Sequence, residues 1–141
     1  GVTSLAGKLS TAYRSSYGGS KHAFIGILDS LRSELRPFGI RVCNIMPGYV
    51  RTNLPKNAFA GKPGEKFGKT DLLIDKGMSP AKFAKHAVGA IYNNENEVSI
   101  CDDWAPVFGI IFRNTCPDIA FFMQFQNAKA QQHAVENAKT D

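Results

Sequence analysis

The sequence has few cysteines and no long apolar run, and each shortage excludes a class of protein. The three cysteines among 141 residues, Cys43, Cys101 and Cys116, lie far apart without C-x-x-C spacing. This pattern argues against a disulfide framework and a metal site, and it indicates reduced, mostly buried thiols that suit an intracellular compartment. No stretch reaches the roughly 18 apolar residues of a membrane-spanning helix, and the segment from Gly1 does not resemble a signal peptide.

Basic runs are also missing, although the net charge is +5. Scattered Lys and Arg residues indicate a solvated surface and no nucleic-acid partner, and they leave a mild attraction to an anionic cofactor or membrane surface open. An apolar content of 43% is that of a globular protein, and the length suits one domain.

Helical and strand patterns alternate along the first hundred residues. The expected elements are a loop at 1–15, a helix at about 16–35, a strand at 40–46, a long loop at 53–78 with a short helix near 71–75, a helix from Pro80 to about Tyr92, and a strand at 97–101. Pro37 and Gly39 mark the end of the first helix, and Ser79 is the expected N-cap of the helix that starts at Pro80. One face of the first helix is expected to carry Phe24, Ile27, Leu28, Leu31 and Leu35, and one face of the later helix Phe83, Ala87 and Ile91.

This alternation predicts an α/β fold with a parallel sheet. The strand at 40–46 is apolar on both faces, as in a sheet covered by helices on both sides. Two strands are too few for such a sheet, so we expect the chain to be part of a larger domain and, by itself, inactive.

Residues 104–125 are rich in aromatic side chains, and a polar, Ala-rich tail follows. We therefore divide the chain into residues 1–103, with a substrate-loop region at 53–78, and residues 104–141. The aromatic segment is interpreted as core or homo-oligomer contact, with a membrane-interface surface as the alternative.

The candidate chemistry lies at the start of the first helix. Tyr17 and Lys21 are four residues apart, so their side chains share one helix face. A phenol has a pKa of about 10, and an adjacent ammonium favours its ionised form, as proton transfer near neutral pH requires. Ser4 precedes this pair, and Pro47-Gly48-Tyr49-Val50-Arg51-Thr52 follows it at the carboxyl end of a predicted strand, the edge where α/β sheets bind ligands.

Together, Ser4, the Tyr17-Gly18-Gly19-Ser20-Lys21 run and the P-G-x-x-x-T run resemble the second half of classical short-chain dehydrogenases/reductases. The resemblance implies the C-terminal part of a Rossmann-type doubly wound sheet, with the N-terminal half absent. Beyond residue 52, Arg51-Thr52-Asn53-Leu54, the start of the helix at Pro80 and the Phe-rich end are similar to the member 7 and 7B branch, which is associated with membranes through an N-terminal anchor.

The resemblance assigns roles to individual residues. Ser4 would bind the substrate carbonyl or hydroxyl, and Tyr17 would donate or accept the proton. Lys21 would hold the nicotinamide ribose and tune Tyr17. The residues that would border the cofactor are Tyr17, Lys21, Pro47, Gly48, Val50 and Thr52. The serines that compete with Ser4 for the substrate role are Ser10, Ser15, Ser16 and Ser20. His22 is interpreted as structural, and His86 and His133 are isolated, without the spacing of metal ligands.

The resemblance implies an NAD(P)-dependent oxidoreductase that interconverts a carbonyl and an alcohol, with NADP(H) placed ahead of NAD(H). We expect a small-molecule substrate of lipid-like character and a location at the endoplasmic reticulum or another organelle membrane. The alternatives are a nucleotide-sugar epimerase or dehydratase and a non-enzymatic module that retains the fold. The family's glycine-rich dinucleotide motif and N-A-G motif do not occur among these residues.

Overall fold

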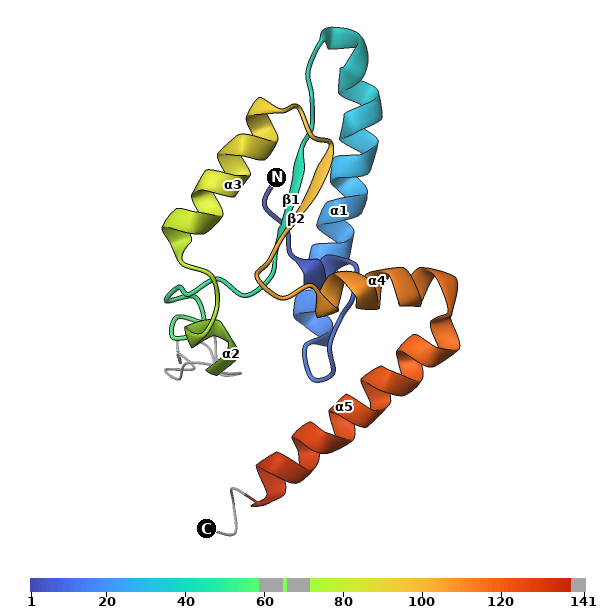
Figure 1. Ribbon diagram of the computed structural model, residues 1–141. Coiled ribbons are helices and arrows are strands. Elements are labelled where there is room, and N and C mark those ends of the chain that lie inside the picture. The colour runs from blue at the N-terminus through green and yellow to red at the C-terminus, as the bar shows by residue number, and fades with distance from the viewer. Residues whose placement is uncertain (59–64, 66–71, 138–141) are drawn as a thin grey trace.

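The computed structural model describes residues 1–58, 65 and 72–137, and it has an α/β architecture (Figure 1). Its elements are η1 (Leu5–Gly7), α1 (Ser15–Leu35), η2 (Arg36–Phe38), β1 (Asn44–Pro47), α2 (Leu72–Asp75), α3 (Pro80–Tyr92), β2 (Glu97–Ile100), α4 (Ala105–Thr115) and α5 (Pro117–Asn137). None of the helices in the described part of the chain is both long and apolar enough to cross a bilayer.

The sheet is parallel, as the alternating pattern predicted. β1 pairs with β2 in a register that places Asn44 opposite Glu97 and Pro47 opposite Ile100. On its other side β1 receives the start of the chain, where Val2 forms a parallel bridge with Ile45. The segment 1–15, expected to be a loop, therefore contains a strand-like bridge and the short helix η1.

Helices cover both faces of this sheet (Figure 1). Ile45 packs with Met78, Ala87 and Ile100 on the α3 side. The next residue, Met46, points to the opposite face because strand side chains alternate, and it packs with Leu5 and Ile25. The double-sided burial predicted for this strand is confirmed.

The first strand is shorter than predicted. It covers Asn44–Pro47 rather than 40–46, and Ile40 is exposed. The ladder cannot begin earlier because its partner β2 starts at Glu97, directly after a turn. The carbonyl of Val42 instead accepts a hydrogen bond from Arg32 Nε at 3.2 Å.

Helix boundaries agree better with the sequence. The helix predicted at 16–35 is α1, Ser15–Leu35, and the positive φ of Gly39 closes the turn behind it. α3 begins at Pro80 after the predicted N-cap Ser79, whose hydroxyl accepts a hydrogen bond from Lys82 N. The short helix expected near 71–75 is α2. The predicted substrate-loop region at 53–78 falls partly outside the described residues, at 59–64 and 66–71.

The predicted helix faces need correction. In α1 the buried apolar residues are Ile25 and Leu28, whereas Phe24 and Ile27 are exposed. In α3 Ala87 and Ala90 are buried and Ile91 is 58% exposed. Both helices carry more apolar residues than one face can hold, so the position of the sheet determines which of them are covered.

Candidate active site

Ser4 is held at the start of a tight turn beside the sheet. It is the N-cap of η1, and its hydroxyl oxygen accepts a hydrogen bond from Ala6 N at 3.2 Å. Its backbone is extended, as expected for a cap that follows a strand-like segment. Because the oxygen accepts this bond, the hydroxyl hydrogen can still be donated to a ligand.

Tyr17 and Lys21 lie on consecutive turns of α1. Lys21 Nζ is 5.6 Å from the centroid of the Tyr17 ring, so the ammonium faces the phenol ring as the spacing predicted. Tyr17 is 38% exposed, and Lys21 is half-buried. A ligand outside the helix can therefore reach both side chains.

The turn that carries Ser4 packs against the same part of α1. A Cβ atom added to Gly7 would lie 2.5 Å from Ile25 Cδ1 and 3.0 Å from the backbone oxygen of Lys21. The backbone of η1 is thus in close contact with the helix at Lys21. The Ser4 turn and the Tyr17–Lys21 pair, separate in the sequence, belong to one packed unit (Figure 1).

The carboxyl end of β1 joins this unit from the other side. Gly48 N donates a hydrogen bond to Ile100 O at 2.9 Å, directly after the paired residue Pro47. A Cβ atom at Gly48 would lie 2.8 Å from Cys101 Cβ and 3.5 Å from Leu5 Cδ1, so Gly48 lies beside the residue that follows Ser4. The segment 47–48 therefore borders the Ser4 turn at the sheet edge where ligands bind in open α/β folds.

Val50 and Thr52 lie farther along this segment. Val50 forms a parallel bridge with Met78, and Arg51 N donates to Met78 O at 2.9 Å. Thr52 accepts a bond from Leu54 N at 3.4 Å. A hollow of about 480 Å³ adjoins Thr52, and its lining residues are Arg51, Thr52, Asn53, Lys56, Asp75 and Pro80.

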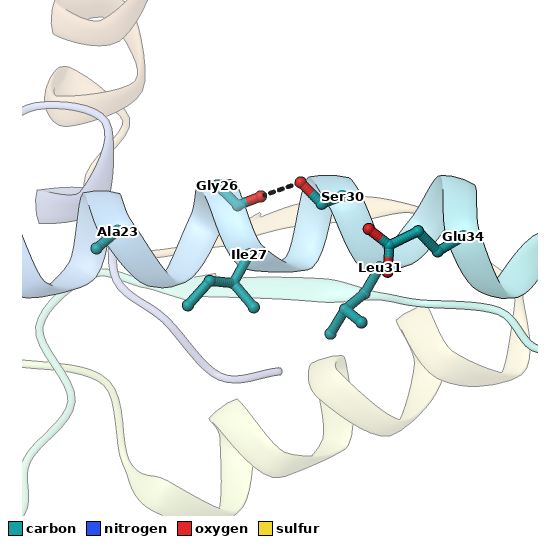
Figure 2. A pocket seen from close by; sticks show the side chains of 6 residues that line it. All are labelled: Ala23, Gly26, Ile27, Ser30, Leu31 and Glu34. Carbon is teal, nitrogen blue, oxygen red and sulfur yellow. Dashed lines mark hydrogen bonds between the residues drawn. The ribbon is translucent and has the colours of Figure 1, made fainter.

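A second hollow, of about 440 Å³, lies along α1 (Figure 2). Its lining residues are Ala23, Gly26, Ile27, Ser30, Leu31 and Glu34, and Ser30 Oγ donates to Gly26 O at 3.2 Å. Neither hollow is lined by Ser4, Tyr17 or Lys21. The candidate residues are therefore recognised from their packing around the sheet edge and not from a cavity.

Two of the competing serines, Ser10 and Ser20, and His22 make local contacts within their own segments. Ser10 Oγ donates to Ala6 O at 3.2 Å, and Ser20 Oγ donates to Tyr17 O at 2.8 Å. The His22 Nδ1 atom lies 2.9 Å from Gly18 O. These contacts are those of structural side chains.

Sequence reasoning overlooked a polar network beneath the Ser4 turn. It comprises Thr3, Lys8, Asn44 and Glu97. The available signal was an asparagine in an otherwise apolar strand, Val42-Cys43-Asn44-Ile45-Met46. Its partners could not be identified from the sequence because they lie on two distant segments, residues 3–8 and β2.

Comparison with known proteins gives the same family for the sequence and the fold. Residues 1–63 match the family model described as short chain dehydrogenase. The chain is 35% identical over 133 residues to a dehydrogenase/reductase SDR family protein 7-like of Drosophila melanogaster, and 35% identical over 130 residues to dehydrogenase/reductase SDR family member 7B of Danio rerio. These alignments cover 94% and 92% of this chain but 40% and 41% of the relatives. The chain therefore spans about two fifths of their length.

A solved structure supports the same assignment. The crystal structure of a short-chain dehydrogenase from Streptomyces avermitilis superimposes with a TM-score of 0.60 at 28% identity, covering 92% of this chain and 49% of that one. The predicted fold class, part of a Rossmann-type α/β domain, is confirmed.

Proposed function

Because the chain is similar to short-chain dehydrogenases/reductases, and in particular to members 7 and 7B, we propose that the intact protein is an NAD(P)-dependent oxidoreductase that interconverts a carbonyl and an alcohol. The observation that carries the proposal is the Tyr17–Lys21 pair, with Lys21 Nζ 5.6 Å from the Tyr17 ring centroid, on a helix packed against the Ser4 turn.

In this proposal the chain's own residues bind the substrate oxygen and transfer the proton to and from it. The Ser4 hydroxyl, oriented by the bond from Ala6 N, donates a hydrogen bond to the carbonyl oxygen. The Tyr17 hydroxyl gives its proton to that oxygen during reduction and takes it back during oxidation. Lys21 places a positive charge beside the phenol ring of Tyr17.

The chemistry of these donors suits a nicotinamide cofactor. Its ribose offers hydroxyls, and the accessible Lys21 ammonium and Tyr17 hydroxyl can bond to them, while Pro47, Gly48, Val50 and Thr52 would border the remainder. When bound, the cofactor supplies or accepts the hydride. We place NADP(H) ahead of NAD(H), and titration of the intact protein with both cofactors decides between them.

We propose a lipid-like substrate. Leu54, two residues after Thr52, is 66% exposed, and Trp104 and Phe108 at the start of α4 are 60% and 58% exposed. These apolar side chains lie on segments adjoining the carboxyl ends of β1 and β2. Comparing long-chain and short-chain ketones of equal reactivity tests this part, and equal KM values would contradict it.

Tyr17→Phe in the intact protein tests the core of the proposal. General acid–base catalysis is typically worth about 10²–10⁴-fold, so kcat for NADPH-dependent carbonyl reduction should fall by that factor while the Kd for NADPH changes little. Tyr13→Phe is the matched control, because Tyr13 is 73% exposed and lacks a lysine four residues on. The 141-residue chain alone, assayed in parallel, should show no turnover.

Two results would contradict the proposal. A Tyr17→Phe protein that retained more than about a third of kcat would remove Tyr17 from proton transfer. An intact protein that bound NADPH but reduced no carbonyl across ketone, aldehyde and quinone panels would favour a non-enzymatic module that retains the fold. Lys21→Ala should lower kcat and also weaken NADPH binding, which distinguishes its two roles from that of Tyr17.

A further inference from the structure

A partly buried polar network connects the residues on both sides of Ser4. Thr3, directly before Ser4, is 3% exposed, and its hydroxyl donates to Asn44 Oδ1 at 2.6 Å. Asn44 Nδ2 donates to Glu97 Oε2 at 3.2 Å, and the other oxygen of this carboxylate pairs with Lys8 Nζ at 2.5 Å. Lys8 follows Ser4 by four residues, so the network begins and ends on the segment that carries Ser4.

The chemistry of the network fixes its direction. Asn44 is fully buried, so its amide group needs partners inside the protein. Because the Thr3 hydroxyl donates to Oδ1, the amide nitrogen is left to donate to Glu97. The carboxylate of Glu97 accepts from both Asn44 and Lys8, and charge-assisted bonds of this kind are stronger than neutral ones.

The network also connects β1, β2 and the segment that bridges to β1 at Val2. Asn44 and Glu97 are directly opposed in the β1–β2 register, and Thr3 N donates to Ile45 O at 2.8 Å. Thr3 is therefore fixed by both its backbone and its side chain. At the other end, Lys8 N donates to Leu5 O at 2.9 Å and closes η1 over the sheet. The turn between these two anchors contains Ser4 and the amide of Ala6 that bonds to it.

We propose that Thr3, Asn44, Glu97 and Lys8 form a positioning network for the Ser4 hydroxyl. None of the four would touch the substrate; each acts through Ser4 by holding one end of its turn. This inference rests on the proposed function, because it requires Ser4 to bind the carbonyl oxygen. The network adds four residues, on three segments, to the candidate active site, and the Tyr17–Lys21 pair requires none of these residues.

Lys8→Met in the intact protein tests the network at its accessible end. The Lys8 and Glu97 side chains are 32% and 33% exposed, so the variant should fold. The matched control is Lys82→Met, which removes an ion pair of the same length, with Asp102, away from the Ser4 turn. Lys8→Arg retains the charge and should behave as wild type, whereas Asn44→Leu should have the effect of Lys8→Met or a larger one.

The first readout is amide hydrogen exchange over residues 3–9. Lys8→Met should accelerate exchange at Ala6 and Gly7 about tenfold, because the turn loses one anchor, and Lys82→Met should leave both amides unchanged. This measurement does not require an identified substrate. Unchanged exchange in Lys8→Met would overturn the proposed network.

The second readout is kcat for NADPH-dependent reduction of 9,10-phenanthrenequinone, a reactive dicarbonyl probe. Lys8→Met should lower kcat about three- to tenfold with an unchanged KM for NADPH, and the loss should vanish in a Ser4→Ala background because both changes act through one hydroxyl. An equal loss in that background would overturn the positioning role while leaving the proposed function intact. If Ser4→Ala itself had an unchanged kcat, the proposed role of Ser4 would be refuted, and the positioning role of the network with it. If the intact wild-type protein reduced no carbonyl, the proposed function would be contradicted as well. Tyr17→Phe tests the oxidoreductase activity separately from the network.

Discussion

Apolar side chains are buried around the two-stranded sheet and exposed along α4 and α5. Ile25, Ile45, Met46 and Ile100 are all at most 6% exposed, because α3 covers one face of the sheet and α1 with α4 covers the other. Along the outer side of α4 and the first half of α5, the large apolar residues are about half exposed: Phe108, Ile111, Phe112, Ile119, Phe121, Phe122, Met123 and Phe125. The difference shows that burial depends on an opposing layer and not on apolar content alone.

α4 itself has both kinds of surface. Val107 and Ile110 pack against the cluster of Leu5, Ile25 and Met46, whereas Phe108 and Ile111 point away from it. α5 then extends from the end of α4 away from the sheet (Figure 1). Ala120 is buried where α5 packs on α4, and Ile119 beside it is 53% exposed. The sheet thus organises the chain as far as one face of α4.

The comparison is tested most strongly by one substitution made in each region. Ile25→Ala in α1 should lower the free energy of unfolding by about 2–5 kcal/mol, because Ile25 is 6% exposed and its loss leaves a cavity. Ile119→Ala in α5 should change it by less than about 0.5 kcal/mol. Urea unfolding of the intact protein measures both. Equal losses would show that α5 is covered in solution and that the two regions do not differ.

Two adjacent glycines of α1 make a smaller version of this comparison. A Cβ atom at Gly18 would lie 2.2 Å from Ser10 Oγ and 2.9 Å from Ser10 Cβ, whereas one at Gly19 would meet nothing within 4 Å. Gly18→Ala should therefore destabilise the protein by about 1–3 kcal/mol, and Gly19→Ala should stabilise it by up to about 1 kcal/mol through helix propensity. Thermal melts that shifted in the same direction for both variants would contradict close packing of segment 4–10 on α1.

The smallest expected effect is a difference in thiol reactivity among the three cysteines. Burial raises the pKa of the Cys101 thiol, and the carboxylates of Asp103 and Asp102 raise it further. Burial also raises the pKa of the Cys43 thiol. Cys116, at the junction of α4 and α5, is exposed. At pH 8 a disulfide reagent should therefore modify Cys116 first, as peptide mass spectrometry of the intact protein would show.

The raised pKa values of Cys43 and Cys101 also make the stability of the fold weakly dependent on pH. A raised thiol pKa favours the neutral thiol in the folded state. Its contribution to stability is therefore present below the pKa of the thiol in the unfolded chain, about 8.5, and is lost as the pH rises through the pKa in the folded state. Cys101→Ala should therefore flatten the loss of stability above about pH 8.5. In the disulfide-reagent experiment, modification of Cys101 before Cys116 would contradict the predicted order and show that the region around β2 is less protected than α4.

Local patterns in the sequence were enough for the elements that local chemistry determines. Ser79 and Pro80 begin α3 as predicted because the N-cap hydroxyl and the fixed φ of proline act within one turn. Pro37 and Gly39 follow the end of α1 for a similar reason. The Tyr17–Lys21 pair was also predictable, because residues four apart share a helix face whatever surrounds the helix. Its catalytic role, like that of Ser4, remains a proposal.

Tertiary structure alone decided which apolar residues are buried. α1 carries apolar side chains on two sides, and only the position of the sheet selects Ile25 and Leu28 over Phe24 and Ile27. The start of β1 depended on a partner strand more than fifty residues away, which is why the prediction of 40–46 was wrong.

The contacts between the segments that form the candidate site could likewise not be predicted from the sequence. Spacing places Tyr17 and Lys21 on one helix, but it does not show that η1 packs against that helix at Lys21. Nor does it show that Thr3 and Lys8 reach the same carboxamide–carboxylate pair through Asn44 and Glu97. The sequence by itself determined the local helices and the identity of the reactive side chains, because those depend on neighbours within a few residues. The tertiary structure decided which distant segments meet around Ser4, because contacts across a sheet depend on register and layer order.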